Sequence, residues 1–166
     1  MGDPRRIKKK FKKPKHPFQK DRMIEELEFI GKYGLRNKRE FWKMRSKLGR
    51  WRQRARYSRT LPAEQATEVQ QTLIKKLTRL GVLSPESTFE DILRLTVEDL
   101  LKRRLQTLVF EKGLAKSVYH ARQLIVHKHI QVGNKRINSP SYLVKREEED
   151  LIQFAPTSPF VSASAA

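Results

Sequence analysis

One stretch decides the fold of the N-terminal half: residues 37–57, which read NKREFWKMRSKLGRWRQRARY. An asparagine opens it and a glutamate follows three residues later, the pattern of a helix N-cap with a capping box. Apolar side chains then recur at helical spacing and share one narrow stripe: Phe41, Met44, Leu48, Trp51 and Ala55. The stretch therefore predicts a helix from Asn37 to Tyr57 whose stripe packs into a core.

The remainder of this helix is basic. We expect one row opposite the stripe, made of Lys43, Lys47, Arg50 and Arg54, and a second row along its flank, made of Arg45, Arg52 and Arg56. Only Glu40 opposes them, so ion pairs between successive turns do not explain the charge. Phosphates relieve such repulsion, and the forked guanidinium group suits them. The pattern predicts phosphate binding by this helix.

Charge dominates the whole chain. The 166 residues include 37 Lys+Arg and 18 Asp+Glu, a net charge of +19. Residues 1–59 carry +16, residues 60–100 carry −3 and residues 101–166 carry +6. So large a charge requires a polyanion, and nucleic acid is a stronger candidate than an acidic membrane surface.

Several classes of protein are disfavoured. The chain has no cysteine, which excludes disulfides, thiolate zinc sites and a cysteine nucleophile. No apolar run approaches the roughly 18 residues of a membrane span, and the basic N-terminus lacks the apolar region of a secretory signal. We expect a soluble cytoplasmic protein with no membrane contact.

Both ends of the chain differ from its middle. Residues 1–20 predict an extended basic arm, since Pro14 and Pro17 interrupt any helix. The arm either orders on phosphates or is a disordered solubilising tail. Residues 155–166 predict a tail that either contacts a neighbour or is disordered. The predicted RNA contacts in the arm are Lys8, Lys9, Lys10, Lys12 and Lys13.

Residues 21–102 predict a helical domain. A first helix, Asp21 to Ile30, is expected to bury Ile24, Leu27 and Ile30. A later helix, from Ala63 to Leu80, stops at Gly81. Threonine followed by an acid three residues later occurs at Thr88 and at Thr96 and marks two helix starts. We expect a short helix at the first and a longer one, running to Glu111, at the second.

Residues 103–154 predict a small mixed module. Ser117 caps a helix that ends near His127, and its outer face carries Lys116, His120, Gln123 and His127. Short strands are expected at 130–132, 142–144 and 151–154, with a tight turn at Gly133-Asn134. The fold class is therefore α+β, with a helical N-terminal domain followed by a module of two helices and an antiparallel sheet.

A resemblance emerges from motifs that occur in order: RLQ at 104–106, GLAKS at 113–117, ARQLI at 121–125, HIQV at 129–132 and PSYLV at 140–144. The series resembles the αL-like RNA-binding module named after ribosomal small-subunit protein S-four. That module also occurs in tyrosyl-tRNA synthetases, pseudouridine synthases and a heat-shock RNA binder. Further stretches resemble the archaeal type of the S-four ribosomal protein family itself: MGDP at 1–4, HPF at 16–18, KYGLRNKRE at 32–40 and LTVEDLL at 95–101.

The resemblance implies a ribosome-bound protein. Family members bind small-subunit ribosomal RNA at a junction of helices early in assembly. They touch neighbouring ribosomal proteins and mRNA near the entry channel, and they influence decoding accuracy. Some relatives carry a zinc knuckle, which this cysteine-free chain lacks.

The site residues follow from this resemblance and from charge. On the long helix the predicted RNA contacts are Lys43, Lys47, Arg50, Arg52, Arg54 and Arg56. In the module they are Arg103, Arg104, Lys112, Lys116, Ser117, Arg122, Gln123, His127, Lys128 and Lys135. Arg122 also has another interpretation, as a helix-packing arginine with a buried stem.

No catalytic constellation, metal site or cofactor motif is predicted. His127 and His129 lie two residues apart where a helix gives way to a strand, which is poor spacing for a metal. Two alternatives to a ribosomal role remain: a free-standing protein that compacts nucleic acid, and an accessory of RNA modification.

Overall fold

The structure is a computed structural model, and it describes residues 9–160. Lys8 lies outside this range, as do residues 161–166 of the predicted tail. The helices are α1 Lys20–Tyr33, α2 Lys38–Ser58, α3 Ala63–Arg79, α4 Asp91–Arg94, α5 Val97–Lys102, α6 Leu105–Glu111, α7 Val118–Val126 and the 3-10 helix η1 Arg146–Glu148. The strands are β1 Ile130–Val132, β2 Lys135–Arg136 and β3 Ile152–Phe154.

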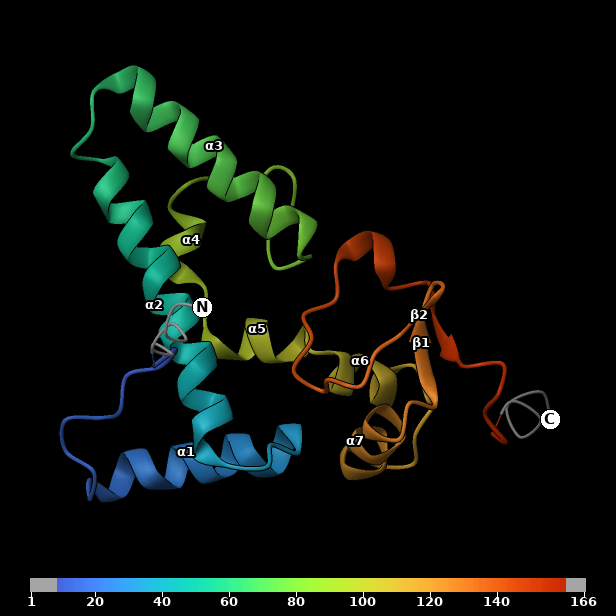
Figure 1. The fold of residues 1–166 in the computed structure, drawn as a ribbon. Helices are drawn as coiled ribbons and strands as arrows, with labels where there is room; N and C mark the ends of the chain where they lie inside the picture. Colours follow the sequence, from blue (N-terminus) through green and yellow to red (C-terminus); the bar gives the residue numbers. More distant parts are fainter. Residues whose placement is uncertain (1–8, 161–166) are drawn as a thin grey trace, which may run out of the picture.

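The elements form two groups, as Figure 1 shows. Helices α1 to α4 lie on one side, helices α6 and α7 lie with the sheet on the other, and α5 lies between them. Each group has its own cluster of buried apolar side chains. The members of the first fall within residues 33–101 of the sequence, and those of the second within residues 105–152. The predicted α+β fold class is confirmed, whereas the domain boundary at 102/103 stays a prediction.

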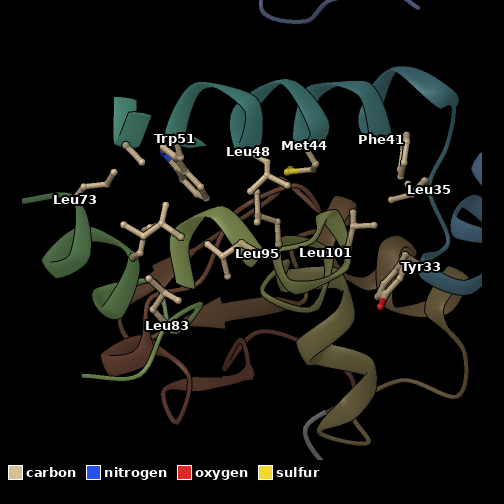
Figure 2. Close-up of a cluster of buried hydrophobic side chains, with 14 residues drawn as sticks. Tyr33, Leu35, Phe41, Met44, Leu48, Trp51, Leu73, Leu83, Leu95 and Leu101 are labelled. Atoms are coloured by element: carbon tan, nitrogen blue, oxygen red, sulfur yellow. The ribbon is translucent and has the colours of Figure 1, made fainter. Parts of the chain in front are cut away.

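Helix α2 is the centre of the first core. The Asn37 side chain accepts a hydrogen bond from the Glu40 N–H at 3.3 Å, which caps the helix as predicted. All five residues of the apolar stripe are buried, and Figure 2 shows the stripe turned toward Leu95 and Leu101. Burial of each large apolar side chain contributes about 1.5–3 kcal/mol, so this stripe holds the helical group together.

Helix α1 packs with a different face from the one predicted. Of the three residues predicted to be buried, Ile24 and Leu27 are exposed and Ile30 is partly buried against the core, while Glu26 and Tyr33 are buried. The Glu26 carboxylate accepts a hydrogen bond from Trp42 Nε1 at 2.9 Å, and this pair turns the side of α1 that carries Glu26 toward α2. Helical periodicity alone predicted that the face with Ile24 and Leu27 is buried. The hydrogen bond to Trp42 on α2 instead favours burial of the face that carries Glu26.

The helix predicted from Thr96 to Glu111 is interrupted. Thr96 does form the predicted capping box with Asp99, but α5 ends at Lys102 and α6 begins at Leu105. Between them the chain pairs with residues 142–144: the Leu105 N–H donates to the Tyr142 carbonyl at 2.8 Å. The same contact accounts for a second wrong prediction, since residues 142–144 form one isolated bridge instead of a strand of the sheet.

The sheet of the module is antiparallel, with strand order β2-β1-β3. Gly133, at φ 57°, makes the turn between β1 and β2, where Val132 faces Lys135. Helix α7 begins after Ser117, whose side chain accepts from the His120 N–H at 3.1 Å as predicted. Across residues 9–160, no helix has the length and apolar character needed to cross a membrane.

Candidate nucleic-acid interface

The outer surface of α2 carries exposed cations. Lys43, Arg50, Arg54 and Arg56 are exposed, and within the described part of the chain none of them has an ion pair with a carboxylate. These four residues form what we call the α2 surface. Because no carboxylate among residues 9–160 compensates their charges, they are available to phosphates.

Lys47 is less accessible than predicted. Its Nζ lies 5.4 Å from the centre of the Trp51 ring, and the side chain is partly buried. Burial lowers the pKa of its ammonium group, and the nearby charges of Lys76 and Arg50 add to the effect. The predicted position opposite the stripe is wrong because this row lies only about 100° around the helix from the stripe.

Residues 9–19, the described part of the arm, lie along α2. Phe11 stacks on Trp42 with 6.1 Å between ring centres, and the Lys12 backbone N–H donates to Ser46 Oγ at 3.0 Å. Arm and helix enclose a groove of about 570 Å³. Its lining contains no carboxylate and has eight cationic residues: Lys9, Lys10, Lys12, Lys13, Lys15, Arg22, Arg45 and Arg50.

The module carries a second set of exposed polar groups. The exposed residues are Lys112, Lys116, Ser117, Gln123, His127, Lys128 and Lys135, which we call the module surface. Three of these seven side chains have partners among residues 9–160, and one of them is His127, whose ring stacks on the His129 ring with 6.3 Å between ring centres. Lys112 lies 3.8 Å from an Asp150 oxygen, and the Ser117 hydroxyl is used by the helix cap.

Three arginines predicted to contact RNA have other partners. Arg52 is partly buried and donates to the Leu95 carbonyl, which ties α2 to the start of α5. Arg103 forms an ion pair with Glu149 at 2.7 Å. The Arg104 side chain is only 1% exposed and donates to Glu40 at 2.8 Å. We therefore take all three out of the proposed contact set, because their guanidinium groups are committed inside the protein.

Arg122 has the packing role that was its alternative interpretation. Its Nη2 donates to Glu40 Oε1 at 2.6 Å, and its Nη1 contacts the Gly34 carbonyl at 3.3 Å and Gln106 Oε1 at 3.2 Å. Burial raises the pKa of the Glu40 carboxyl, but the Arg122 hydrogen bond and the charges of both arginines outweigh it, so the pKa lies below its usual value. Glu40 therefore does not complete the predicted capping box.

Sequence reasoning missed Glu40 and Gln106 as members of this cluster. The signal was present in each case. Glu40 is the single acid in the basic stretch 37–57, and Gln106 belongs to the RLQ motif at 104–106, which was used only as a mark of family resemblance. Neither signal identifies a partner, because the partner residues lie far away in the sequence.

The beginning of the tail packs on the module. The Ala155 N–H donates to the His129 carbonyl at 2.7 Å, and Ser158 Oγ lies 3.2 Å from His129 Nδ1. Phe160 meets the His129 ring edge-on, with 5.2 Å between ring centres. Up to Phe160, therefore, the tail covers His129.

Taken together, two exposed cationic surfaces on a helical group and a small α+β module define an RNA-binding protein. Within residues 9–160 no group of three or more metal-ligating side chains is close enough to hold a metal ion. Residues 103–150 match the family description "S4 domain", and residues 5–102 match "Ribosomal protein S4/S9 N-terminal domain".

Relatives with curated names match over nearly the whole chain. A protein named small ribosomal subunit protein uS4 from Ignicoccus hospitalis is 53% identical over 160 residues, which are 96% of this chain and 96% of the relative. The protein of the same name from Hyperthermus butylicus is 51% identical, covering 96% of this chain and 91% of the relative. That from Sulfolobus acidocaldarius is 49% identical, covering 96% and 92%. The chain belongs to the uS4 family of small ribosomal subunit proteins, in its archaeal form.

Proposed function

We propose that this protein is a structural constituent of the small ribosomal subunit and binds ribosomal RNA through two surfaces at once. The observation that carries the proposal is the groove between residues 9–19 and α2, whose lining has eight cationic residues and no carboxylate. Of these eight, Arg22 alone has an ion pair within the described part of the chain, with Glu26 at 3.5 Å. Such a groove is self-repelling in the free protein, so an RNA backbone placed in it relieves the repulsion as well as adding contacts.

The mechanism is electrostatic clamping. The arm and the α2 surface neutralise crowded phosphates of one RNA segment, and the module surface holds a second segment. Phosphate contacts set position and orientation, while preference for a folded RNA comes from the shape that both surfaces match together. The polar face of α7, with Gln123 and His127 exposed, supports hydrogen bonding to sugar hydroxyls and phosphates.

The family relationship extends the proposal. It supports binding at a junction of RNA helices early in subunit assembly, contact with neighbouring ribosomal proteins, and a place near the mRNA entry channel with an influence on decoding accuracy. It also supports a ribosome-bound, cytoplasmic and non-catalytic role. These finer statements rest on the resemblance to the S-four ribosomal protein family that the sequence motifs carry.

Sedimentation of cell lysate at high salt tests the proposal, with detection of this chain in each fraction. We expect it to migrate with small ribosomal subunits and to survive the salt wash. Migration with free RNA, with DNA or in the soluble pool would contradict the ribosomal role and favour the compaction or RNA-modification alternatives.

An equilibrium measurement complements it. At physiological salt, specific complexes of this kind are commonly about 10³-fold or more tighter than nonspecific ones. A compaction protein that uses phosphate contacts alone has comparable affinity for a small-subunit rRNA transcript and for an unrelated RNA duplex. We expect a strong preference for the transcript.

A further inference from the structure

The two surfaces are joined by a buried polar cluster. Glu40, in the first turn of α2, accepts hydrogen bonds from Arg104 at the start of α6 and from Arg122 on α7. Gln106 is fully buried, and its Nε2 donates to the Gly34 carbonyl at 2.9 Å and to the Val118 carbonyl at 3.0 Å. The cluster therefore connects the end of α1 and the start of α2 with both helices of the module.

The carboxylate is the member on which the others depend. Arg104 is buried, and its Nε and Nη1 atoms have no hydrogen-bond partner. Its charge is compensated through a single bond to Glu40 Oε2, while Arg122 donates to both carboxylate oxygens, at 2.6 Å to Oε1 and 3.3 Å to Oε2. Without this anion, the buried Arg104 and the partly buried Arg122 would repel each other and draw in water. The contact between α2 and the module would then loosen.

The surrounding geometry makes the contact close. An added Cβ at Gly34, which has φ 56°, would lie 2.8 Å from both Gln106 Nε2 and Val118 Cγ1. The backbone at the end of α1 thus touches the module directly, and the ion cluster lies next to that point. A shift of either group would have to break these charge-assisted hydrogen bonds first.

We propose that Glu40 is a positioning residue for RNA recognition: its ion pairs with Arg104 and Arg122 hold the module at one angle to α2, so that the α2 surface and the module surface meet RNA as one rigid unit. The inference rests on the proposed function, because it concerns how both surfaces engage the same RNA. Rigid presentation removes the ordering penalty of binding and raises the effective concentration of the second surface.

The direction in which one substitution changes RNA affinity distinguishes a positioning role from simple attraction between charges. Glu40→Gln removes a negative charge, so simple attraction to phosphates predicts tighter binding of every RNA. Positioning predicts the opposite for an RNA that spans both surfaces. We expect the affinity of Glu40→Gln for a small-subunit rRNA transcript to fall by about tenfold or more, through loss of preorganisation. Affinity for an unrelated RNA duplex, which either surface can bind alone, should stay within about twofold of the unmodified protein.

Glu98→Gln is the matched control. It makes the same change of charge at a carboxylate of α5 that accepts from Lys32 and Tyr33 on α1, so neither of these partners belongs to α6 or α7. We expect it to bind both RNAs as well as, or slightly better than, the unmodified protein.

A distance measurement gives a readout that folding stability alone does not move. Because the chain has no cysteine, spin labels can be placed at Gln65→Cys on α3 and Asn134→Cys in the β1–β2 turn, both exposed. We expect one narrow distance distribution in the free protein and a broader one after Glu40→Gln. The Glu98→Gln control should leave the distribution narrow.

The possible outcomes are distinct. Equal affinities for Glu40→Gln and the unmodified protein, or a parallel loss for both RNAs, would overturn the positioning role. If Glu40→Gln fails to fold, Arg122→Gln decides by the same two affinities, since it leaves the Glu40–Arg104 pair in place. Absence of any transcript preference in the unmodified protein would instead refute the proposed function and leave the distance measurement as the test of rigidity.

Discussion

The α2 surface offers the most direct test of phosphate binding. The perturbation is the triple change Lys43→Gln, Arg50→Gln and Arg54→Gln. All three side chains are exposed on one side of the helix. Such surface changes alter the free energy of unfolding by less than about 0.5 kcal/mol each, so a change in RNA affinity reports on binding.

The magnitude follows from counterion release. Each phosphate contact adds about 0.9 to the slope of log affinity against log salt on duplex DNA, and we expect a similar value for the helices of a folded RNA. Loss of three contacts should therefore reduce the slope by about 2.7. As the salt concentration rises from 50 to 200 mM, the ratio of the affinity of the unmodified protein to that of the triple variant should therefore fall by roughly 40-fold.

The assay is a salt titration of affinity for a labelled small-subunit rRNA transcript. A matched variant, Lys75→Gln, Lys76→Gln and Arg79→Gln, removes the same charge from exposed positions of α3. We expect this control to change the slope by less than about 0.9, which is the contribution of one phosphate contact. Equal slopes for the two triple variants would refute the reasoning, because total charge would then matter and its location would not.

Three further outcomes are expected. Gly34→Ala should lower the free energy of unfolding by about 2–3 kcal/mol, because Gly34 has a left-handed conformation and an added Cβ would lie 2.8 Å from Val118 Cγ1. Gly113→Ala, also left-handed but with open space around the added Cβ, should lower it by only about 1 kcal/mol. Thermal unfolding of the two variants makes the comparison. Lys47→Met should raise the free energy of unfolding in urea and weaken rRNA binding. Burial and neighbouring cations lower the pKa of this lysine, so its charge is unfavourable in the free protein. The pKa of the Glu40 carboxyl is lowered because its arginine partners outweigh burial. Its contribution to the free energy of unfolding should therefore be complete above about pH 5 and lost as the pH falls through the folded-state pKa. Glu40→Gln should lose less stability than the unmodified protein across that acid range, which unfolding measured against pH checks.

Local structure was predictable from the sequence at particular places. The stripe of α2 was correct because five apolar residues at helical spacing can be buried together on only one face. The caps at Asn37, Thr96 and Ser117 were correct because each bond joins atoms three residues apart. The turn at Gly133 was correct for a similar reason, since a left-handed conformation favours glycine.

The site was predictable in part. The exposed cations of the arm, the α2 surface and the module surface remain predicted RNA contacts. The roles of Arg52 and Arg104 could not be read from the sequence, because both look like members of basic clusters. Their acceptors, the Leu95 carbonyl and the Glu40 carboxylate, lie 43 and 64 residues away.

By itself, then, the sequence determined the α+β class, the long helix with its buried stripe, the helix caps and the uneven distribution of charge. These depend on composition and on interactions within a turn or two of chain. Tertiary structure alone decided which face of α1 is buried, where the chain breaks between α5 and α6, and which arginines face solvent. Each of those outcomes depends on a partner brought from elsewhere in the chain, as when Glu40 meets Arg122 across 82 residues. Burying an unpaired charge is costly, so the arrangement that gives the buried arginine a carboxylate is favoured.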